Sequence, residues 1–216
     1  MRLASVIAVL HGNSIDNMHE KWQVVVMILT LKVNLWIVAK MMLLSAVFVM
    51  IKMTSNWYTD SRQAIEQLYG DDADMFCDIL AATSPRKQVK VNWDIAQHIY
   101  ERYKHDGYID CQGLMGSHIP NVLRALSREP LHGYKVPAFA ANLKGDMNRV
   151  TIDLWVLRYF GLKQNRIRRK EYYRLEKAIQ LLAKHRGMLP AEYQAIIWCK
   201  AVTRANRIPV SYADMI

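Results

Sequence analysis

The sequence predicts an all-α protein. Beyond Met53, apolar residues recur at the three- and four-residue spacing of helices, and no segment alternates apolar and polar residues for long enough to build a sheet. Glycine, proline and N-capping residues divide these stripes into short helices joined by turns. At 216 residues, the chain is long enough for one well-packed helical domain and an additional segment.

The N-terminal segment differs from the rest of the chain in its apolar composition. The run of residues 24–51 is longer than the roughly 20 residues that cross a bilayer, although Lys32 and Lys40 interrupt it. A lysine near a bilayer centre costs roughly 2.5–3.5 kcal/mol, which the surrounding apolar residues can offset. The run starts too late and is too long for a typical signal peptide. Residues 1–52 are therefore a leader translated from an upstream start, a membrane anchor or a helix that packs on the domain, and residues 53–216 form a helical domain.

Two helices are expected between Met53 and Pro85. Asp60 and Gln63 have the spacing of a capping box at a helix start, and Gly70 can end that helix in a left-handed conformation. The next helix ends before Pro85, because the residue that precedes a proline resists the α conformation. Its apolar stripe consists of Met75, Phe76, Ile79 and Leu80.

Four further stripes indicate the remaining helices outside the segment of residues 132–161. The first consists of Val91, Ile95, Ile99 and Tyr103. Ser117 is the expected N-cap of the second helix, and Pro130 prevents that helix from continuing. The third stripe consists of Leu175, Ala178, Ile179 and Leu182. Pro190 occupies a first-turn position and begins the last helix.

The charge of the chain favours a polyanionic partner. There are 29 Lys and Arg residues against 19 acidic residues, a net charge of +10, which suits nucleic acid or an anionic membrane surface. Nine basic and two acidic residues lie between Lys163 and Arg186. The motif RIRRKEYYR within this stretch can bind phosphates and stack tyrosines on bases, unless it is simply a solvated helix face. Its candidate DNA contacts are Arg166, Arg168, Arg169 and Lys170.

The sequence gives no sign of a metal site or a cofactor. The three cysteines are far apart and lack C-x-x-C spacing, so they predict neither a zinc site nor a disulfide framework. His132 and His185 have no second ligand at metal spacing. A reducing cytoplasm is the expected compartment, with membrane association if the apolar run is an anchor.

The most informative segment runs from His132 to Gly161. A glycine-containing turn enters a helix at Lys135, and Asp153 lies eighteen residues later, where another helix begins. Backbone amides at such a turn can bind a DNA phosphate, and the candidate contacts are His132, Gly133 and Tyr134. The Lys135 amine is a nucleophile if burial lowers its pKa, and a nearby carboxylate can stabilise positive charge or transfer a proton. Alternatively, Lys135 is a surface cation and Asp153 is only an N-cap.

This segment resembles the helix-hairpin-helix DNA glycosylases, the superfamily of endonuclease III and 8-oxoguanine DNA glycosylase. Their pattern is L-x-G-x-G-x-K, an apolar helix and then V-D-x-H. It aligns Lys135 with the Schiff-base lysine and Asp153 with the catalytic aspartate. IDLWVLRY is similar to V-D-T-H-I-F-R-V, including Arg158, which adds a DNA-binding candidate. DILAATSPRKQVKVNWDIAQHIY is similar to the early helices of the superfamily, so the resemblance covers roughly residues 75–162.

The resemblance implies a helix-hairpin-helix fold and an enzyme that flips a base out of duplex DNA and cleaves its glycosidic bond. It implies that Lys135 forms an imine at the sugar C1′, with strand cleavage to follow, and that Asp153 stabilises the cationic transition state. The sequence departs from the pattern at Gly133, the single hairpin glycine, and at Trp155, which replaces the histidine. No iron–sulfur cluster is expected, because the terminal four-cysteine pattern is absent. A non-catalytic DNA-binding module and a membrane-tethered interaction protein are the alternatives.

Overall fold

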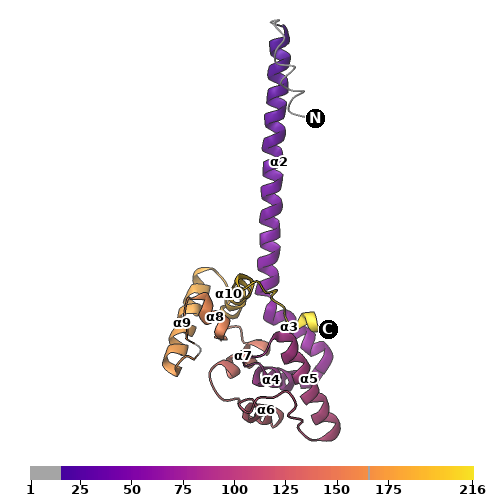
Figure 1. The fold of residues 1–216 in the computed structure, drawn as a ribbon, viewed down its shortest axis with the longest axis vertical. Coiled ribbons are helices and arrows are strands. Elements are labelled where there is room, and N and C mark those ends of the chain that lie inside the picture. Colours follow the sequence, from indigo (N-terminus) through magenta and orange to yellow (C-terminus); the bar gives the residue numbers. More distant parts are fainter. Residues whose placement is uncertain (1–15, 165) are drawn as a thin grey trace. The chain divides into compact units, whose positions relative to one another are not determined.

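The computed structural model describes residues 16–164 and 166–216. All of their regular secondary structure is helical, and these residues contain no β-strand, which confirms the all-α prediction (Figure 1). The chain divides into two compact units, Met1–Met50 and Ile51–Ile216, a boundary two residues before the one expected at Met53.

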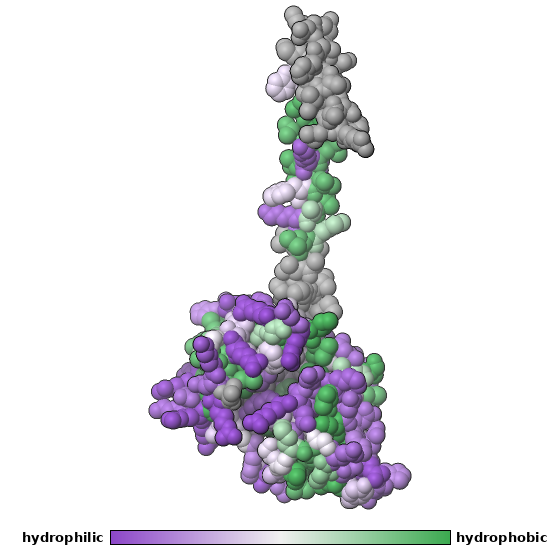
Figure 2. Space-filling model, in the orientation of Figure 1, coloured by the Kyte–Doolittle hydropathy of each residue, from purple (hydrophilic) through white to green (hydrophobic). Residues whose placement is uncertain are grey.

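Helix α2 (Asp16–Ser55) contains the apolar run. Its stretch Val25–Leu43 is long and apolar enough to cross a membrane, and none of it is buried within the protein. Leu35 is 74% exposed and Met41 is 65% exposed, and Figure 2 shows apolar side chains along this stretch with few hydrophilic ones between them. An all-round apolar helix of this length is unfavourable in water, since such helices are normally buried in protein or lipid.

The first half of the second unit has an aromatic core. Helices α3 (Trp57–Tyr69), α4 (Ala73–Thr83), α5 (Val89–Asp106), α6 (Ile119–Leu126) and α7 (Lys135–Leu143) contribute to it. A short 3₁₀ turn, η1 (Gly70–Asp72), joins α3 to α4, and another, η2 (Ala213–Met215), lies at the C-terminal end. Phe76 of α4 is fully buried, stacks on Tyr69 at a centroid distance of 3.7 Å and meets the edge of Trp93 at 5.2 Å.

Helices α8 (Leu154–Tyr159), α9 (Arg169–His185) and α10 (Pro190–Arg204) enclose a second core. They gather on one side of the unit, away from α4, α5 and α6 (Figure 1). Tyr172, Ile179 and Ile197 are buried in this core, and the half-buried Trp198 packs against both cores. Trp198 therefore lies where the two halves of the unit meet.

Some of the helix ends predicted from local sequence signals are confirmed, and others are wrong. Gly70 follows α3, α4 ends before Pro85, and α10 begins at Pro190, as predicted. Gly70 has a positive φ of +49°, but its ψ of −122° differs from the αL conformation that was expected. The expected capping box at Asp60 is wrong, because α3 begins at Trp57 and Asp60 lies in its first turn. The helix starts earlier because Trp57 and its neighbour bury their rings in the core. Ser117 is likewise not the N-cap of α6, a position that the buried His118 occupies.

Candidate active site

The turn before α7 places Lys135 at the first position of that helix. Gly133 in this turn has φ +103°, a conformation that glycine adopts far more readily than other residues. Asn121 of α6 fixes the turn, because its Oδ1 accepts a hydrogen bond from the His132 N–H at 2.7 Å. The Asn121 Nδ2 also donates to the His132 carbonyl oxygen at 3.1 Å. The Asn121 side chain thus binds both the N–H and the carbonyl oxygen of His132 and fixes the backbone that enters α7.

The Lys135 amine is directed inward and is held by Ser84. Its Nζ donates to the Ser84 Oγ at 3.0 Å, and that hydroxyl donates in turn to the Ala81 carbonyl oxygen at 2.9 Å. Burial lowers the pKa of Lys135 from its ordinary value, while the charge of Asp153 opposes this shift. Among the ion pairs of the described residues, none involves Lys135. The amine is therefore more readily deprotonated than a surface lysine.

Asp153 is the N-cap of α8, and its carboxylate is also part of the pocket. Its Oδ1 accepts the Val156 N–H at 2.9 Å, and its Oδ2 accepts the indole N–H of Trp198 at 3.0 Å. Burial raises the pKa of Asp153, and the opposing influences are the nearby Lys135 and these hydrogen bonds. The capping role and the pocket position therefore coexist in one side chain.

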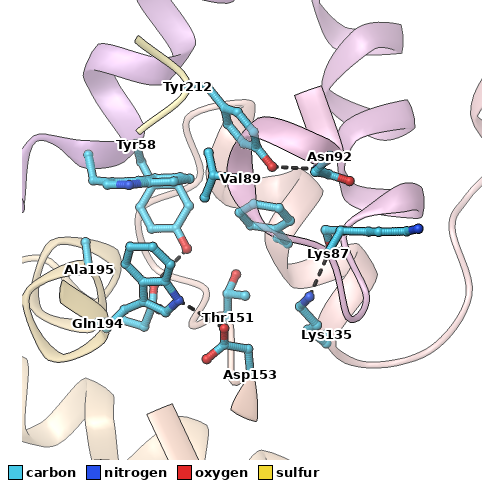
Figure 3. A pocket seen from close by; sticks show the side chains of 14 residues that line it. Tyr58, Lys87, Val89, Asn92, Lys135, Thr151, Asp153, Gln194, Ala195 and Tyr212 are labelled. Atoms are coloured by element: carbon cyan, nitrogen blue, oxygen red, sulfur yellow. Dashed lines mark hydrogen bonds between the residues drawn. The ribbon is translucent and has the colours of Figure 1, made fainter. Parts of the chain in front are cut away.

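Lys135 and Asp153 line the same pocket, whose volume is about 70 Å³ (Figure 3). Aromatic rings form much of its wall, and Figure 3 shows Thr151 beside Asp153. The Tyr58 hydroxyl donates to the Gln194 Oε1 at 2.7 Å, which fixes the orientation of both side chains. The aromatic residues of the wall are Trp57, Tyr58, Phe139, Trp198 and Tyr212.

The pocket combines the groups that amine catalysis needs. A lowered pKa makes the neutral, nucleophilic form of a lysine amine more accessible, and a fixed carboxylate can stabilise positive charge on a reacting carbon or take up a proton. Both groups border one small cavity, which is a precondition for their acting on the same substrate. Flat aromatic walls suit a planar or sugar-like substrate.

A family model matches residues 40–206, and its description is a family of unknown function (DUF7178). The chain belongs to this family. The match includes helices α3 to α10 and therefore both Lys135 and Asp153. It begins inside α2, near the end of the apolar stretch. No curated protein and no solved structure matched the chain.

All but one of the predicted DNA-binding residues are exposed, and the exception, Tyr134, is half-buried. His132 and Gly133 are exposed in the turn before α7. Tyr134 is half-buried, and its ring packs against Tyr172 at a centroid distance of 5.7 Å, so it is partly committed to the second core. The basic candidates are exposed on α8, in the segment before α9 and in the first turn of α9: Arg158, Arg166, Arg168, Arg169 and Lys170.

The second half of the unit carries most of the excess positive charge. Residues 150–207 contain thirteen Lys and Arg residues and four acidic residues, which leaves +9 of the net +10. None of these thirteen side chains forms an ion pair with the part of the chain that the structure describes. Most of the ion pairs lie instead among residues 62–144.

The four carboxylates of residues 150–207 are already engaged by other groups. Glu171 accepts the backbone N–H of Arg168 at 3.0 Å, and Glu192 accepts that of Leu189 at 3.0 Å. Glu176 pairs with Arg149, and Asp153 is held as described above. The positive charge of this half is therefore unneutralised, and it favours a polyanion.

Proposed function

We propose that the protein is a DNA glycosylase that uses the Lys135 amine as its nucleophile and has an associated lyase step. The observation that carries this proposal is the convergence of Lys135 and Asp153 on one pocket from two different helix starts. Their spacing in the sequence and their resemblance to the Schiff-base lysine and catalytic aspartate of helix-hairpin-helix glycosylases support the same reaction.

The reaction begins with a nucleotide rotated out of the duplex, because the sugar C1′ is shielded within the base stack. The neutral Lys135 amine attacks C1′, so that an Nζ–C1′ bond forms while the bond from C1′ to the base breaks. The base leaves with the bonding electron pair and takes up a proton. Asp153 stabilises the positive charge that develops on the sugar, and it accepts a proton from the attacking amine.

The bond between Nζ and C1′ then leads to an imine. Opening of the sugar ring transfers the C1′–O4′ electron pair to O4′, which takes up a proton, while Nζ forms a double bond to C1′. This iminium makes the neighbouring C2′ proton acidic, and its loss permits elimination of the 3′ phosphate. Ser84 holds the amine at the start of this sequence, because its Oγ accepts the hydrogen bond from Nζ.

Trapping with borohydride tests the catalytic proposal. The protein is mixed with duplexes that each carry a different damaged base or an abasic site, and borohydride reduces any imine to a stable covalent adduct. The native protein is expected to form an adduct, and Lys135→Ala is expected to form none. Lys87→Ala is the matched control, because Lys87 lines the same pocket but donates to the Gly113 carbonyl oxygen. Salt-sensitive binding without any adduct would instead indicate a non-catalytic DNA-binding module.

Membrane tethering is a second candidate role, carried by a separate observation. The exposed stretch Val25–Leu43 has 19 residues, which at 1.5 Å per residue extends about 28 Å and matches a hydrocarbon core of roughly 30 Å. Lys40 lies near the end of this stretch, with its Nζ 4.6 Å from the centre of the Trp36 ring. A lysine at this position can reach the membrane interface, whereas Lys32 and Trp36 each lie two residues from the middle of the stretch. We propose that α2 anchors the protein to a bilayer.

A further inference from the structure

Three arginines, one on α8, one at the end of α10 and one just after α10, contact two aromatic rings of α8. The Arg158 and Arg207 guanidinium carbons lie 4.8 Å and 5.5 Å from the centre of the Trp155 ring. The Arg204 guanidinium carbon lies 5.0 Å from the centre of the Tyr159 ring, one turn further along α8. We call Arg158, Arg204 and Arg207 the arginine triad.

The triad keeps its hydrogen-bonding groups available. All three side chains are exposed, and within the described residues none of them has a carboxylate partner or a side-chain hydrogen bond. Stacking on an aromatic ring uses the face of a guanidinium and leaves its N–H edge free. Guanidinium edges bind phosphate oxygens in pairs, so the triad presents a ready site for an anionic group.

The backbone fixes the triad before any ligand binds. Helix α10 ends at Arg204, and Asn206 has φ +56°, a left-handed conformation that ends the helix. The Arg207 N–H then donates to the Val202 carbonyl oxygen at 3.2 Å, which anchors the following segment to the helix. Helix α8 packs against α10, and the Trp155 ring of α8 is contacted by both Arg158 and Arg207. Such fixed positions reduce the entropy lost when a ligand is bound.

We propose that the arginine triad binds the phosphate backbone of the DNA strand that enters the pocket, and this proposal rests on the proposed function. The triad is connected directly to the pocket. Trp155 follows Asp153 by two residues, and Trp198, which donates to Asp153, precedes Arg204 by six residues on α10. Six residues correspond to about 9 Å along a helix. Phosphates recur about every 3.4 Å of axis along one strand, so the triad reaches phosphates within a few nucleotides of the flipped one.

The triad also gives a role to Trp155, the residue that replaces the histidine of the glycosylase pattern. The ring is half-buried, and two cations contact it. A core tryptophan would instead be enclosed by apolar side chains. Trp155 orients two guanidinium groups toward solvent, and it is therefore a positioning residue of the proposed phosphate site.

The salt dependence of DNA binding tests this site in the full-length protein. The Lys135→Ala background is used throughout, so that no covalent step contributes. Neutralising two triad members, Arg204→Gln with Arg207→Gln, is expected to reduce the slope of log affinity against log salt by roughly 1.8, which is about 0.9 for each duplex phosphate that is no longer neutralised. Arg102→Gln is the matched control, because Arg102 also stacks on a ring, that of Tyr108, but is paired with Asp106. This control is expected to leave the slope unchanged.

Neutral methylphosphonate linkages locate the contact. A single neutral linkage is placed at successive positions on either side of an abasic site, and binding is measured for the native and doubly substituted triad. At a contacted position, the arginine substitutions are expected to have a smaller effect on binding, because one of the phosphates that they contact is already neutral. A slope equal to that of the Arg102→Gln control would overturn the proposal, as would a loss of binding to phosphatidylserine vesicles without any change for DNA. A reduced slope, together with no imine adduct when the protein that retains Lys135 is trapped with borohydride, would retain the triad and reject the glycosylase proposal.

Discussion

Replacing Trp198 with phenylalanine tests how the pocket controls Asp153. The substitution keeps an aromatic ring beside Trp57, at present 5.9 Å away, but removes the indole N–H that donates to the Asp153 Oδ2 at 3.0 Å. A hydrogen bond to a charged group contributes about 1.5–3 kcal/mol. At about 1.36 kcal/mol per pKa unit, its loss is expected to raise the pKa of Asp153 by roughly one to two units. The hydrogen bond from Val156 remains, so the carboxyl group keeps its capping contact.

The loss in stability should depend on pH. Burial already raises the pKa of Asp153 above its ordinary value of 3.8, so ionisation of this group opposes folding as the pH rises. The substitution raises the folded-state pKa further. The loss in the free energy of unfolding caused by the substitution is therefore small below the pKa of Asp153 in the unfolded chain, and it grows as the pH rises. It reaches about 1.5–3 kcal/mol above the pKa of Asp153 in the folded variant. Weaker packing of the smaller ring adds a contribution that is the same at every pH.

Urea unfolding of the full-length protein in non-ionic detergent, at a series of pH values, measures this dependence. Trp57→Phe is the matched control, because the Trp57 indole donates to the neutral Val210 carbonyl oxygen at 3.0 Å. The control is expected to lose the same stability at every pH. If the Trp198 variant behaves like this control, the hydrogen bond does not act on an ionised Asp153 and the reasoning fails.

Three further outcomes are expected. Asp153→Asn removes the charge that raises the pKa of Lys135, so the pH midpoint of imine trapping should shift downward. The maximal rate of trapping should also fall. An upward shift of the midpoint would contradict this coupling. Arg168→Gln with Arg169→Gln should reduce the salt slope of DNA binding by roughly 0.9 for each phosphate that the variant no longer neutralises, and an unchanged slope would return both residues to solvated surface. The native protein should stay in the membrane fraction after alkaline carbonate extraction. The variant Leu35→Glu should be partly released, because it places a charge in the apolar stretch Val25–Leu43. Release of the native protein itself would exclude anchoring.

The sequence was most informative where local backbone chemistry decides the structure. Pro85, Pro190 and Gly70 marked helix ends correctly, because a missing N–H or a positive φ acts within a few residues. The signals at Asp60 and Ser117 failed, because other residues of those segments are buried in the core and extend or shift the helices. Tertiary packing there outweighed the preference of a cap.

The candidate site could be predicted only in part. Lys135 and Asp153 were recognised from their spacing, and the structure brings both to one pocket. Ser84 was interpreted only as the residue before a proline, yet its hydroxyl accepts a hydrogen bond from the amine of Lys135, 51 residues away. Trp198 carried no signal for its contact with Asp153, 45 residues away, because an apolar stripe does not show which side chain reaches a carboxylate. Arg204 and Arg207 were also missed, because stacking on α8 depends on how two helices pack.

The most direct test of the central claim is to map the adduct after borohydride reduction. The reduced complex of the native protein and an abasic or damaged duplex is digested with protease and nuclease, and the modified peptide is identified by mass spectrometry. The account predicts a sugar remnant on Nζ of Lys135 and an unmodified Lys87, which lines the same pocket. Its yield should rise with pH about a midpoint below the ordinary lysine pKa of 10.5, because burial lowers the pKa of Lys135. An adduct on another amine, or no adduct on any duplex that the protein binds, would contradict the account.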